Sequence, residues 1–200
     1  CLVFSIDVGD GQISFESQVA CSGSAADLYF EIAPNYEERS EHRITVKASD
    51  GINSSYQDLI ISVVNVNEAP VFRDEWRDAN YELLPGPDFF SEENSSGIFG
   101  SFSPQDDDGR EIQMGISGDE IYITQYDKLA WVTPPDYEVK TYYEATITLS
   151  DGELSSSQLI SVTILNLDDT APVFASSNLF SVEENQTSIG AVTATDIDTD

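Results

Sequence analysis

Apolar and polar residues alternate with a period of two along much of the chain. Ile44, Val46 and Ala48 each stand between polar neighbours, and the same alternation returns in the stretch from 145 to 149. Because successive side chains of a β-strand point to opposite faces of a sheet, this pattern predicts half-buried strands of antiparallel sheets. Turn dipeptides of the Asp-Gly and Pro-Gly type separate the apolar runs, and no capped stretch with helical periodicity lies between them. We therefore expect an all-β fold.

The same landmarks recur in the same order at an offset of 101 residues. Three stretches have such counterparts: 28–37 with 129–138, 48–51 with 149–152, and 59–65 with 160–166. A fourth, the Ala-Pro-Val-Phe that begins at Ala69, returns at Ala171, one residue later because of the extra Thr170. Repeats of about 100 residues with many short strands predict tandem immunoglobulin-like antiparallel β-sandwiches, joined end to end.

The Ala-Pro-Val-Phe elements mark the module boundaries. Proline lacks an N–H and ends the ladder of the strand before it, while Val-Phe begins the first strand of the next module. We therefore expect residues 1–68 to be the C-terminal part of module one, residues 69–170 to be the complete module two, and residues 171–200 to be the N-terminal opening of module three.

The net charge of the chain limits the classes of molecule that it could bind. It has 37 Asp and Glu against 8 Lys and Arg, a net charge of −29, which disfavours nucleic acid and anionic membrane surfaces. A solubility or salt adaptation, a basic partner, or bound cations could each explain the excess. No run of 18 apolar residues occurs, so no transmembrane segment is expected in this stretch.

The informative carboxylates lie next to the module boundaries. At the second junction, between modules two and three, the candidate ligands are Glu93, Asp136, Glu138, Asn166, Asp168, Asp169, Asp196 and Asp198. Crowded carboxylates repel one another unless a multivalent cation lies among them, and Ca²⁺ needs six to eight oxygen ligands. The pattern predicts a calcium site that stiffens the linker, because its ligands come from both modules and the connector.

These motifs resemble the signatures of cadherin repeats over essentially the whole chain. The matching elements are Glu93-Asn94, Asp136-Tyr-Glu138, Leu149-Ser-Asp151-Gly152, Asn166-Leu-Asp168-Asp169-Thr-Ala-Pro172 and Asp196-Ile-Asp198. The residues that stand in these motifs resemble most those of tandem cadherin-like repeats in large bacterial surface proteins. The resemblance implies several Ca²⁺ ions per junction, an extracellular or cell-surface location in a larger protein, and an adhesion or spacer role. The implied partners are another copy of the protein, a cell-surface protein or a polysaccharide.

The first junction departs from the family pattern. Its candidate ligands are Asn35, Glu37, Asn65, Asn67, Glu68, Asp106, Asp108 and Asp151. Asparagine stands at two positions where the pattern has aspartate, Asn35 and Asn65. Amide oxygens coordinate calcium but add no charge, so we expect this junction to bind Ca²⁺ more weakly.

The sequence contains few other residues that could bind a metal or take part in catalysis. Cys1 and Cys21 could form a bridge in an oxidising compartment, Cys1 could pair outside this stretch, or both could stay reduced. His42 is expected to be an exposed loop residue, and neither a Cys/His zinc site nor a catalytic triad can be assembled around it. No enzyme function is predicted.

One alternative function stays open at this point. A carbohydrate-binding module of a secreted enzyme or adhesin could use the insertion at 73–89, with Trp76 and Tyr81, since this segment has no counterpart in module three. Trp131 aligns with Phe30 and is expected in the core. The three Asn-x-Ser/Thr sequons, whose use the sequence does not decide, begin at Asn53, Asn94 and Asn185.

Overall fold

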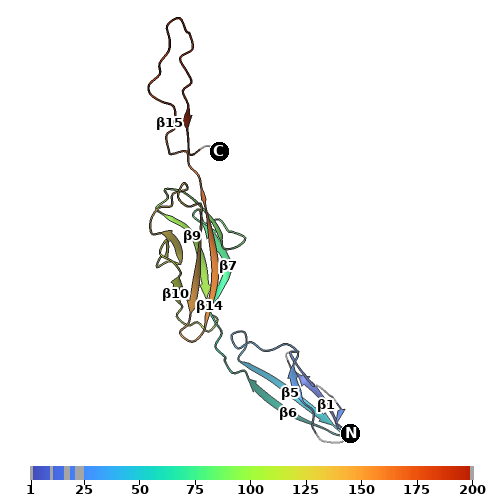
Figure 1. The fold of residues 1–200 in the computed structure, drawn as a ribbon. Helices are drawn as coiled ribbons and strands as arrows, with labels where there is room; N and C mark the ends of the chain where they lie inside the picture. The colour runs from blue at the N-terminus through green and yellow to red at the C-terminus, as the bar shows by residue number, and fades with distance from the viewer. Residues whose placement is uncertain (1, 10, 16–18, 21–24, 199–200) are drawn as a thin grey trace. The chain divides into compact units, whose positions relative to one another are not determined.

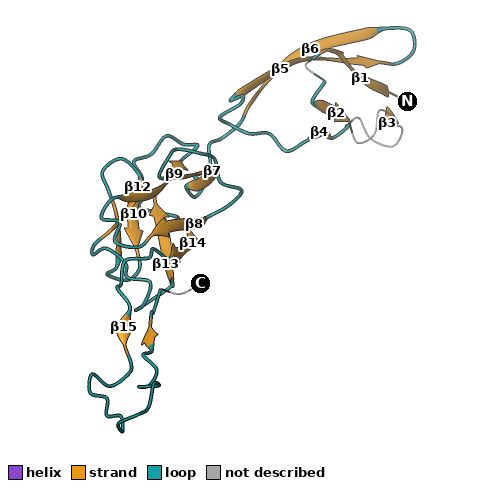
Figure 2. Ribbon diagram, turned by 90° about the horizontal axis from the view of Figure 1, so that it is seen from above, coloured by secondary structure: helices purple, strands orange, loops and turns teal. Residues whose placement is uncertain are grey.

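The structure is a computed structural model that describes residues 2–9, 11–15, 19–20 and 25–198. The described residues form strands and no helix, which confirms the predicted all-β fold. The chain divides into two compact units, Cys1–Glu68 (unit one) and Ala69–Asp200 (unit two), which Figures 1 and 2 show as separate sets of strands. None of the described residues belongs to a helix long and apolar enough to span a membrane. Cys1 and Cys21 lie outside the described residues.

Unit one has two antiparallel sheets. Its strands are β1 (Leu2–Val8), β2 (Ile13–Phe15), β3 (Val19–Ala20), β4 (Leu28–Phe30), β5 (Glu41–Ser49) and β6 (Ser54–Ser62). The larger sheet has the order β3-β1-β5-β6, and the smaller pairs β2 with β4. The β5–β6 hairpin turns at Asp50-Gly51, where Gly51 has a φ of 95°, as its Asp-Gly dipeptide predicts.

Unit two contains two four-stranded sheets and a short two-stranded pair. Its strands are β7 (Val71–Asp78), β8 (Asp88–Glu92), β9 (Ile98–Gln105), β10 (Gln113–Ile116), β11 (Ile121–Ile123), β12 (Lys128–Trp131), β13 (Tyr142–Ser150), β14 (Ser155–Leu165), β15 (Val173–Phe174) and β16 (Ala194–Thr195). The sheet orders are β10-β13-β14-β8, β11-β12-β9-β7 and β15-β16. All pairs are antiparallel except β8 with β14, which is parallel.

The core of unit two is formed by the alternating apolar residues of these strands. On β14, Ile160, Val162 and Ile164 are at most 2 % exposed, whereas the side chains between them lie nearer the surface. A chain of aromatic contacts runs through the same core, and Trp131 packs within it on Phe99 at a ring-centroid distance of 4.7 Å. The predicted core role of Trp131 is confirmed.

Two expectations for single residues are wrong. Trp76 is 4 % exposed and stacks on Phe72 in the core, so it does not face a carbohydrate. His42 lies on β5, is 1 % exposed and meets the Phe30 ring edge to face at 5.0 Å. The period of two that turns Ile44 inward also turns His42 inward, and its position decides its burial more than its polarity does.

Candidate metal centre

Glu93 connects three segments of unit two through hydrogen bonds. It follows β8 directly and is 3 % exposed. The N–H of Tyr137 donates to its Oε2 (2.9 Å), and the N–H of Leu167 donates to its Oε1 (2.7 Å). Asn94, next along the chain, has a φ of 60°, and its N–H donates to the carbonyl of Pro135. Glu93 therefore fixes the strand end, the loop at 135–137 and the linker after β14 relative to one another.

The loop after β12 brings two more carboxylates to Glu93. Asp136 turns this loop, because its Oδ1 accepts from the N–H of Val139 (3.1 Å) and its carbonyl from the N–H of Lys140. Glu138 is half-buried beside it. Glu93, Asp136 and Glu138 each offer one carboxylate oxygen, and these oxygens all lie within 4.8 Å of one another.

A second acidic group shares Glu138 with the first. It consists of Glu138, Asp169 and Asp198, whose ligand oxygens again lie within 4.8 Å of one another. Asp198 is 7 % exposed, and its Oδ2 accepts from the N–H groups of both Asp169 and Thr170 in the linker. The amide of Asn94 donates to Asp169 Oδ2. Four stretches of unit two thus converge: the end of β8, the 136–138 loop, the linker and residues 196–198.

The electrostatics of the cluster are unfavourable without a cation. Burial raises the pKa of Glu138, and the negative charges of Glu93 and Asp198 raise it further. Arg43, Arg110 and Lys140 form their ion pairs with carboxylates outside the cluster, namely Glu41, Glu153 and Glu120. A divalent cation at this place would supply the missing positive charge and favour the ionised form of Glu138.

Three buried oxygens support such a fit. Glu138 Oε1, Asn166 Oδ1 and Asp198 Oδ1 are inaccessible to solvent and accept no hydrogen bond from the described residues. An unsatisfied buried acceptor costs roughly 1–3 kcal/mol, so three at one place need an explanation. Carboxylate and amide oxygens are the ligands that Ca²⁺ prefers. The residues present therefore fit a calcium ion.

The remaining candidates of the second junction have separate places. Asp168 is exposed and belongs to neither acidic group. Asp196 holds the last turn, since its Oδ1 accepts from the N–H of Asp198 (3.1 Å). Asn166 contributes the buried amide oxygen described above.

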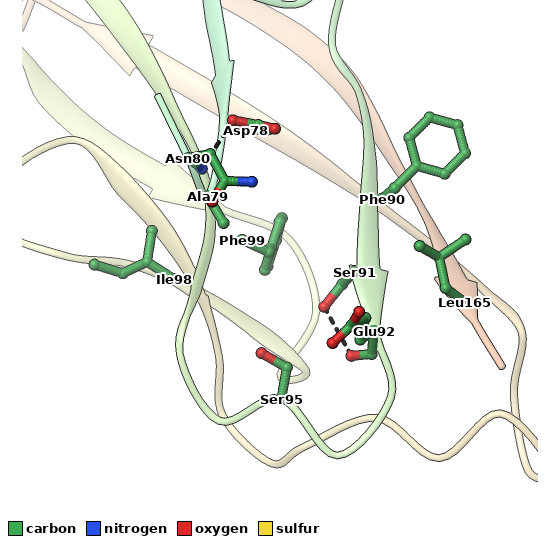
Figure 3. Close-up of a pocket in the computed structure, with 10 residues that line it drawn as sticks. All are labelled: Asp78, Ala79, Asn80, Phe90, Ser91, Glu92, Ser95, Ile98, Phe99 and Leu165. Carbon is green, nitrogen blue, oxygen red and sulfur yellow. Dashed lines mark hydrogen bonds between the residues drawn. The ribbon is translucent and has the colours of Figure 1, made fainter. Parts of the chain in front are cut away.

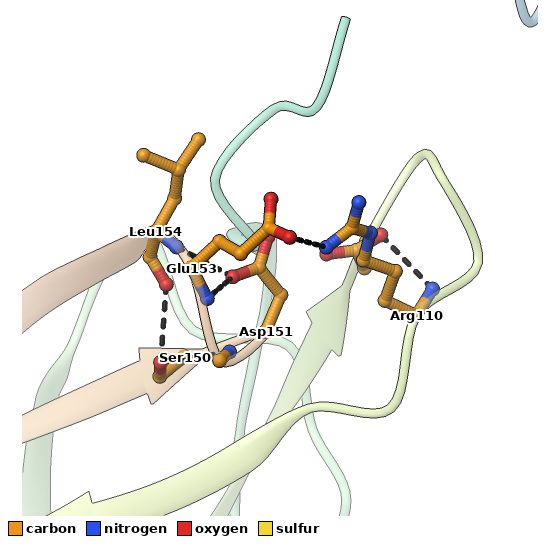
Figure 4. A network of polar contacts seen from close by, with 7 residues as sticks. Arg110, Ser150, Asp151, Glu153 and Leu154 are labelled. Atoms are coloured by element: carbon orange, nitrogen blue, oxygen red, sulfur yellow. Dashed lines mark hydrogen bonds and ion pairs between the residues drawn. The ribbon is translucent and has the colours of Figure 1, made fainter. Parts of the chain in front are cut away.

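The candidates of the first junction lie on both units and are described for each unit alone. In unit two, Asp151 Oδ1 accepts from the N–H groups of Glu153 (2.7 Å) and Leu154 (2.6 Å) (Figure 4). Asp106 Oδ1 accepts from the N–H of Arg110 (3.1 Å). In unit one, Asn35 Oδ1 accepts from the N–H of Glu37 (2.7 Å). Of the other four, Asn65 and Glu68 are exposed, and Asn67 and Asp108 are half-buried.

Arg110 is the residue of this region that the sequence did not indicate. Its guanidinium lies 3.2 Å from Glu153, as Figure 4 shows. The hydrogen bond with Glu153 raises the pKa of Arg110, and the charges of Glu153, Asp151 and Asp108 raise it further. A basic residue two positions after Asp108 is the only local sign of this role.

A separate hollow lies beside the β7 hairpin (Figure 3). Its volume is about 420 Å³, and its lining includes Asp78, Phe90, Ser91, Ile98 and Leu165. The acidic groups that could hold a metal in the described residues lie elsewhere. The hollow is thus distinct from the candidate metal centre.

The comparisons with known proteins agree with this architecture. No protein-family model matches the chain. Human Protocadherin-15 is 26 % identical over 218 residues, covering 98 % of this chain and 10 % of that protein. Human Protocadherin-23 is 40 % identical over 92 residues, covering 40 % of this chain and 3 % of that protein. The chain thus spans a tenth or less of the length of these curated relatives.

Solved structures show the same fold. Protocadherin Gamma B2 extracellular cadherin domains 3–6 match with a TM-score of 0.64 at 21 % identity, covering 100 % of this chain and 49 % of that one. A Protocadherin gammaB7 EC3-6 cis-dimer structure matches with a TM-score of 0.56 at 26 % identity, covering 96 % and 47 %. The likeness to bacterial repeats stays a prediction, since the two relatives named are human. The chain thus has a cadherin-like fold and resembles the extracellular cadherin repeats of these proteins along its length.

Proposed function

We propose that the chain forms calcium-binding adhesion or spacer modules, in which Ca²⁺ at the junctions stiffens a multi-repeat surface protein. The observation that carries the proposal is the pair of acidic groups joined at Glu138. Their members come from module two, from the linker and from the opening of module three. A cation bound by all three would restrain the linker, because any bend would break coordination bonds.

The residues that would hold the metal follow from the geometry. Glu93, Asp136 and Glu138 would form one part of the site, and Glu138, Asp169 and Asp198 the other. The buried amide oxygen of Asn166 would complete the coordination. Asp168 and Asp196 stay candidates from the sequence. When bound, calcium would supply the charge that lets these carboxylates ionise side by side.

The first junction is proposed as a weaker site. Asn35 keeps the turn that Asp136 makes in the next module, but it brings no charge. Asn65 and Asn67 likewise offer amide oxygens in its linker. Arg110 adds a positive charge next to Asp151 and Asp108, which also opposes cation binding.

The binding partner is proposed as another copy of the parent protein. This rests on the relatedness to protocadherins, one of which is described as a cis-dimer. A cell-surface protein and a polysaccharide are the alternative partners. The carbohydrate-binding module is not proposed, because the Trp76 ring on which it depended is in the core. No catalytic activity is proposed either, since the relatives are adhesion proteins.

A calcium titration of thermal unfolding tests the metal site. At a Ca²⁺ concentration about 100 times the Kd, binding should stabilise the chain by about 2.7 kcal/mol, which raises the Tm by roughly 10 °C. Glu138→Gln should abolish most of this rise, because Glu138 belongs to both acidic groups. Glu144→Gln, the same chemical change at an exposed position of β13, should retain it.

Two results would contradict the proposal. One is a Tm that chelation with EDTA leaves unchanged in the original chain. The other is an equal calcium response in the Glu138→Gln and Glu144→Gln variants.

A further inference from the structure

The lysine at the end of the 136–140 turn is held by two contacts outside the candidate metal centre. The Nζ of Lys140 lies 2.8 Å from Oε1 and 2.7 Å from Oε2 of Glu120. The same Nζ lies 4.1 Å from the centroid of the Tyr143 ring. We call these three residues the Lys140 anchor. None of them belongs to either of the two acidic groups described above.

The two partners of Lys140 are fixed by the sheets and the core of unit two. Tyr143 lies on β13 and is 8 % exposed, and its ring meets Trp131 edge to face at 4.8 Å. Glu120 directly precedes β11, and its carbonyl accepts from the N–H of Val132 (2.9 Å). The ammonium group of Lys140 is therefore held by residues whose positions do not depend on a bound metal.

Lys140 is joined to the candidate metal ligands through its own backbone. Its N–H donates to the carbonyl of Asp136 (2.9 Å) and so closes the turn that carries Asp136 and Glu138. Because the turn is short, the position of Lys140 limits the positions of both carboxylates. A shift of Glu138 would alter both acidic groups, since it belongs to each.

The end of this turn has little apolar packing of its own. Tyr137 packs against the core, but Val139 is 79 % exposed. A hollow of about 320 Å³ lies beside the turn, and its lining includes Asp136, Val139 and Tyr143. Since no tightly packed side chains fill this space, the end of the turn depends on the contacts of Lys140.

Unit one has a different pair of residues at the same place. The carbonyl of Gln12 accepts from the N–H that follows β4 (2.8 Å), as the carbonyl of Glu120 does after β12 (2.9 Å). Gln12 is therefore the counterpart of Glu120, and the offset of 101 makes Arg39 the counterpart of Lys140. Both members of the pair are charged in unit two only, which is also the unit with aspartate in the loop.

We propose that Lys140 is a positioning residue for calcium, which lowers the Kd because its anchor holds the 136–140 turn ready for the ion. This inference rests on the proposed calcium function. A turn that is already in the binding conformation loses less conformational entropy when the ion binds. Groups that orient metal ligands without touching the metal commonly strengthen metal binding in this way.

The proposed effect has the opposite sign to the direct effect of charge. Lys140 carries a positive charge beside a cation site, so through space alone its removal would tighten calcium binding. Loss of the anchor would instead weaken binding, because the turn would have to be ordered by the ion. The direction in which the Kd changes therefore distinguishes positioning from simple repulsion.

Calorimetric titration of the chain with Ca²⁺ tests the proposal on the binding step that Glu138→Gln removes. Lys140→Gln should raise the Kd of that step about threefold to tenfold, the range for one partly exposed ion pair with a ring contact. Lys140→Arg should restore most of the affinity, since a guanidinium can also pair with Glu120 and lie over the ring.

Lys128→Gln is the matched control. It removes the same charge and a similar ring contact, since the Nζ of Lys128 lies 4.7 Å from the centroid of the Tyr81 ring. It should leave the Kd unchanged, because Lys128 lies on β12 and not in the turn.

A double variant tests whether Glu120 acts through Lys140. Glu120→Gln alone should raise the Kd, and Glu120→Gln combined with Lys140→Gln should raise it no further than Lys140→Gln does. Unchanged or tighter binding by Lys140→Gln would overturn the anchor and leave the calcium site in place. The absence of any calcium-binding step in the original chain would overturn both.

Discussion

At the scale of single residues, Asn35 and Asp136 show what one atom changes between repeats. Both side-chain oxygens accept hydrogen bonds from backbone N–H groups two or three residues further on. The loop is therefore turned in the same way in unit one and in unit two. Exchanging a carboxylate oxygen for an amide nitrogen keeps this turn but removes one negative charge from the junction. The repeats can thus differ in calcium affinity without differing in fold.

Asp127 provides a prediction at this scale. It has a φ of 57°, and burial raises the pKa of its carboxyl group. A carboxyl whose pKa is higher in the folded state binds a proton more readily there, so its ionisation opposes folding once the pH exceeds its usual pKa. Asp127→Asn should therefore stabilise unit two at pH 7 by a few tenths of a kcal/mol, since asparagine also tolerates positive φ.

Thermal unfolding at pH 7 and at about pH 3 measures this effect, with pH values chosen on either side of the usual aspartate range. The gain should vanish at the lower pH, where the folded and unfolded carboxyl groups are both protonated. Asp119→Asn, at an exposed position, is the charge-matched control and should change little. A gain of equal size at both pH values would mean that the backbone conformation, and not ionisation, is the cause.

At the scale of elements, the close approach of β9 to β8 depends on Gly100 in β9, over which the Phe89 ring of β8 lies. Phe89 is 1 % exposed, and its ring is also edge to face with Phe99 at 5.7 Å. The absence of a side chain at Gly100 is therefore what lets β9 lie this close to β8.

Gly100→Ala should destabilise unit two by about 1–3 kcal/mol, the usual range for an overpacked core. Its Cβ would lie 2.3 Å from the Phe89 ring. Gly97→Ala, with no atom within 4 Å of the added Cβ, should change stability far less. Denaturant unfolding of both variants measures the difference. Equal midpoints would show that Phe89 is free to shift.

The sequence predicts some of these elements well and others not at all. Alternation and Asp-Gly turns locate β5, β6, β13 and β14, because each signal lies within a few neighbouring residues. The parallel pairing of β8 with β14 joins positions 73 residues apart, such as Asp88 and Ser161, and leaves no local pattern. Trp76 was misjudged because its insertion has no aligned partner whose burial could be compared.

The candidate site likewise contains residues that the sequence predicts and residues that it does not. The repeat picks out Glu93, Glu138 and Asp198, since each recurs at a boundary. It does not separate Asp169, which joins an acidic group, from its neighbour Asp168, which joins none. That choice depends on the path of the linker, which is held by the hydrogen bonds from Leu167 to Glu93 and from Thr170 to Asp198. Neither bond can be inferred from spacing.

At the scale of the whole molecule, the net charge of −29 is compatible with folding because its acidic residues have two different roles. Most acids coat exposed surfaces, where water and salt screen them. The few that converge at a junction are screened less, and the proposed Ca²⁺ would offset their mutual repulsion. The charge of the chain thus favours solubility on its surfaces, and our proposal adds metal dependence at its junctions.

The proposed adhesion can be tested on the chain displayed on beads. Bead aggregation in the presence of Ca²⁺ that reverses in EDTA is expected, since the modules present a defined surface only when their linkers are stiffened. Beads that stay dispersed in Ca²⁺ would contradict adhesion between copies and leave the cell-surface protein or polysaccharide as partner.

The parallel pairing of β8 with β14 also determines how a module bears tension. A pull on the linker beyond Leu165 draws β14 along its own axis. Its ladders to β8 and β13 run along that axis, so their hydrogen bonds are loaded together and do not open one after another. The carboxylate of Glu93 accepts a hydrogen bond from the N–H of Leu167 in the linker, and this bond is loaded by the same pull at the end of β14. A module built in this way resists stretching by shear.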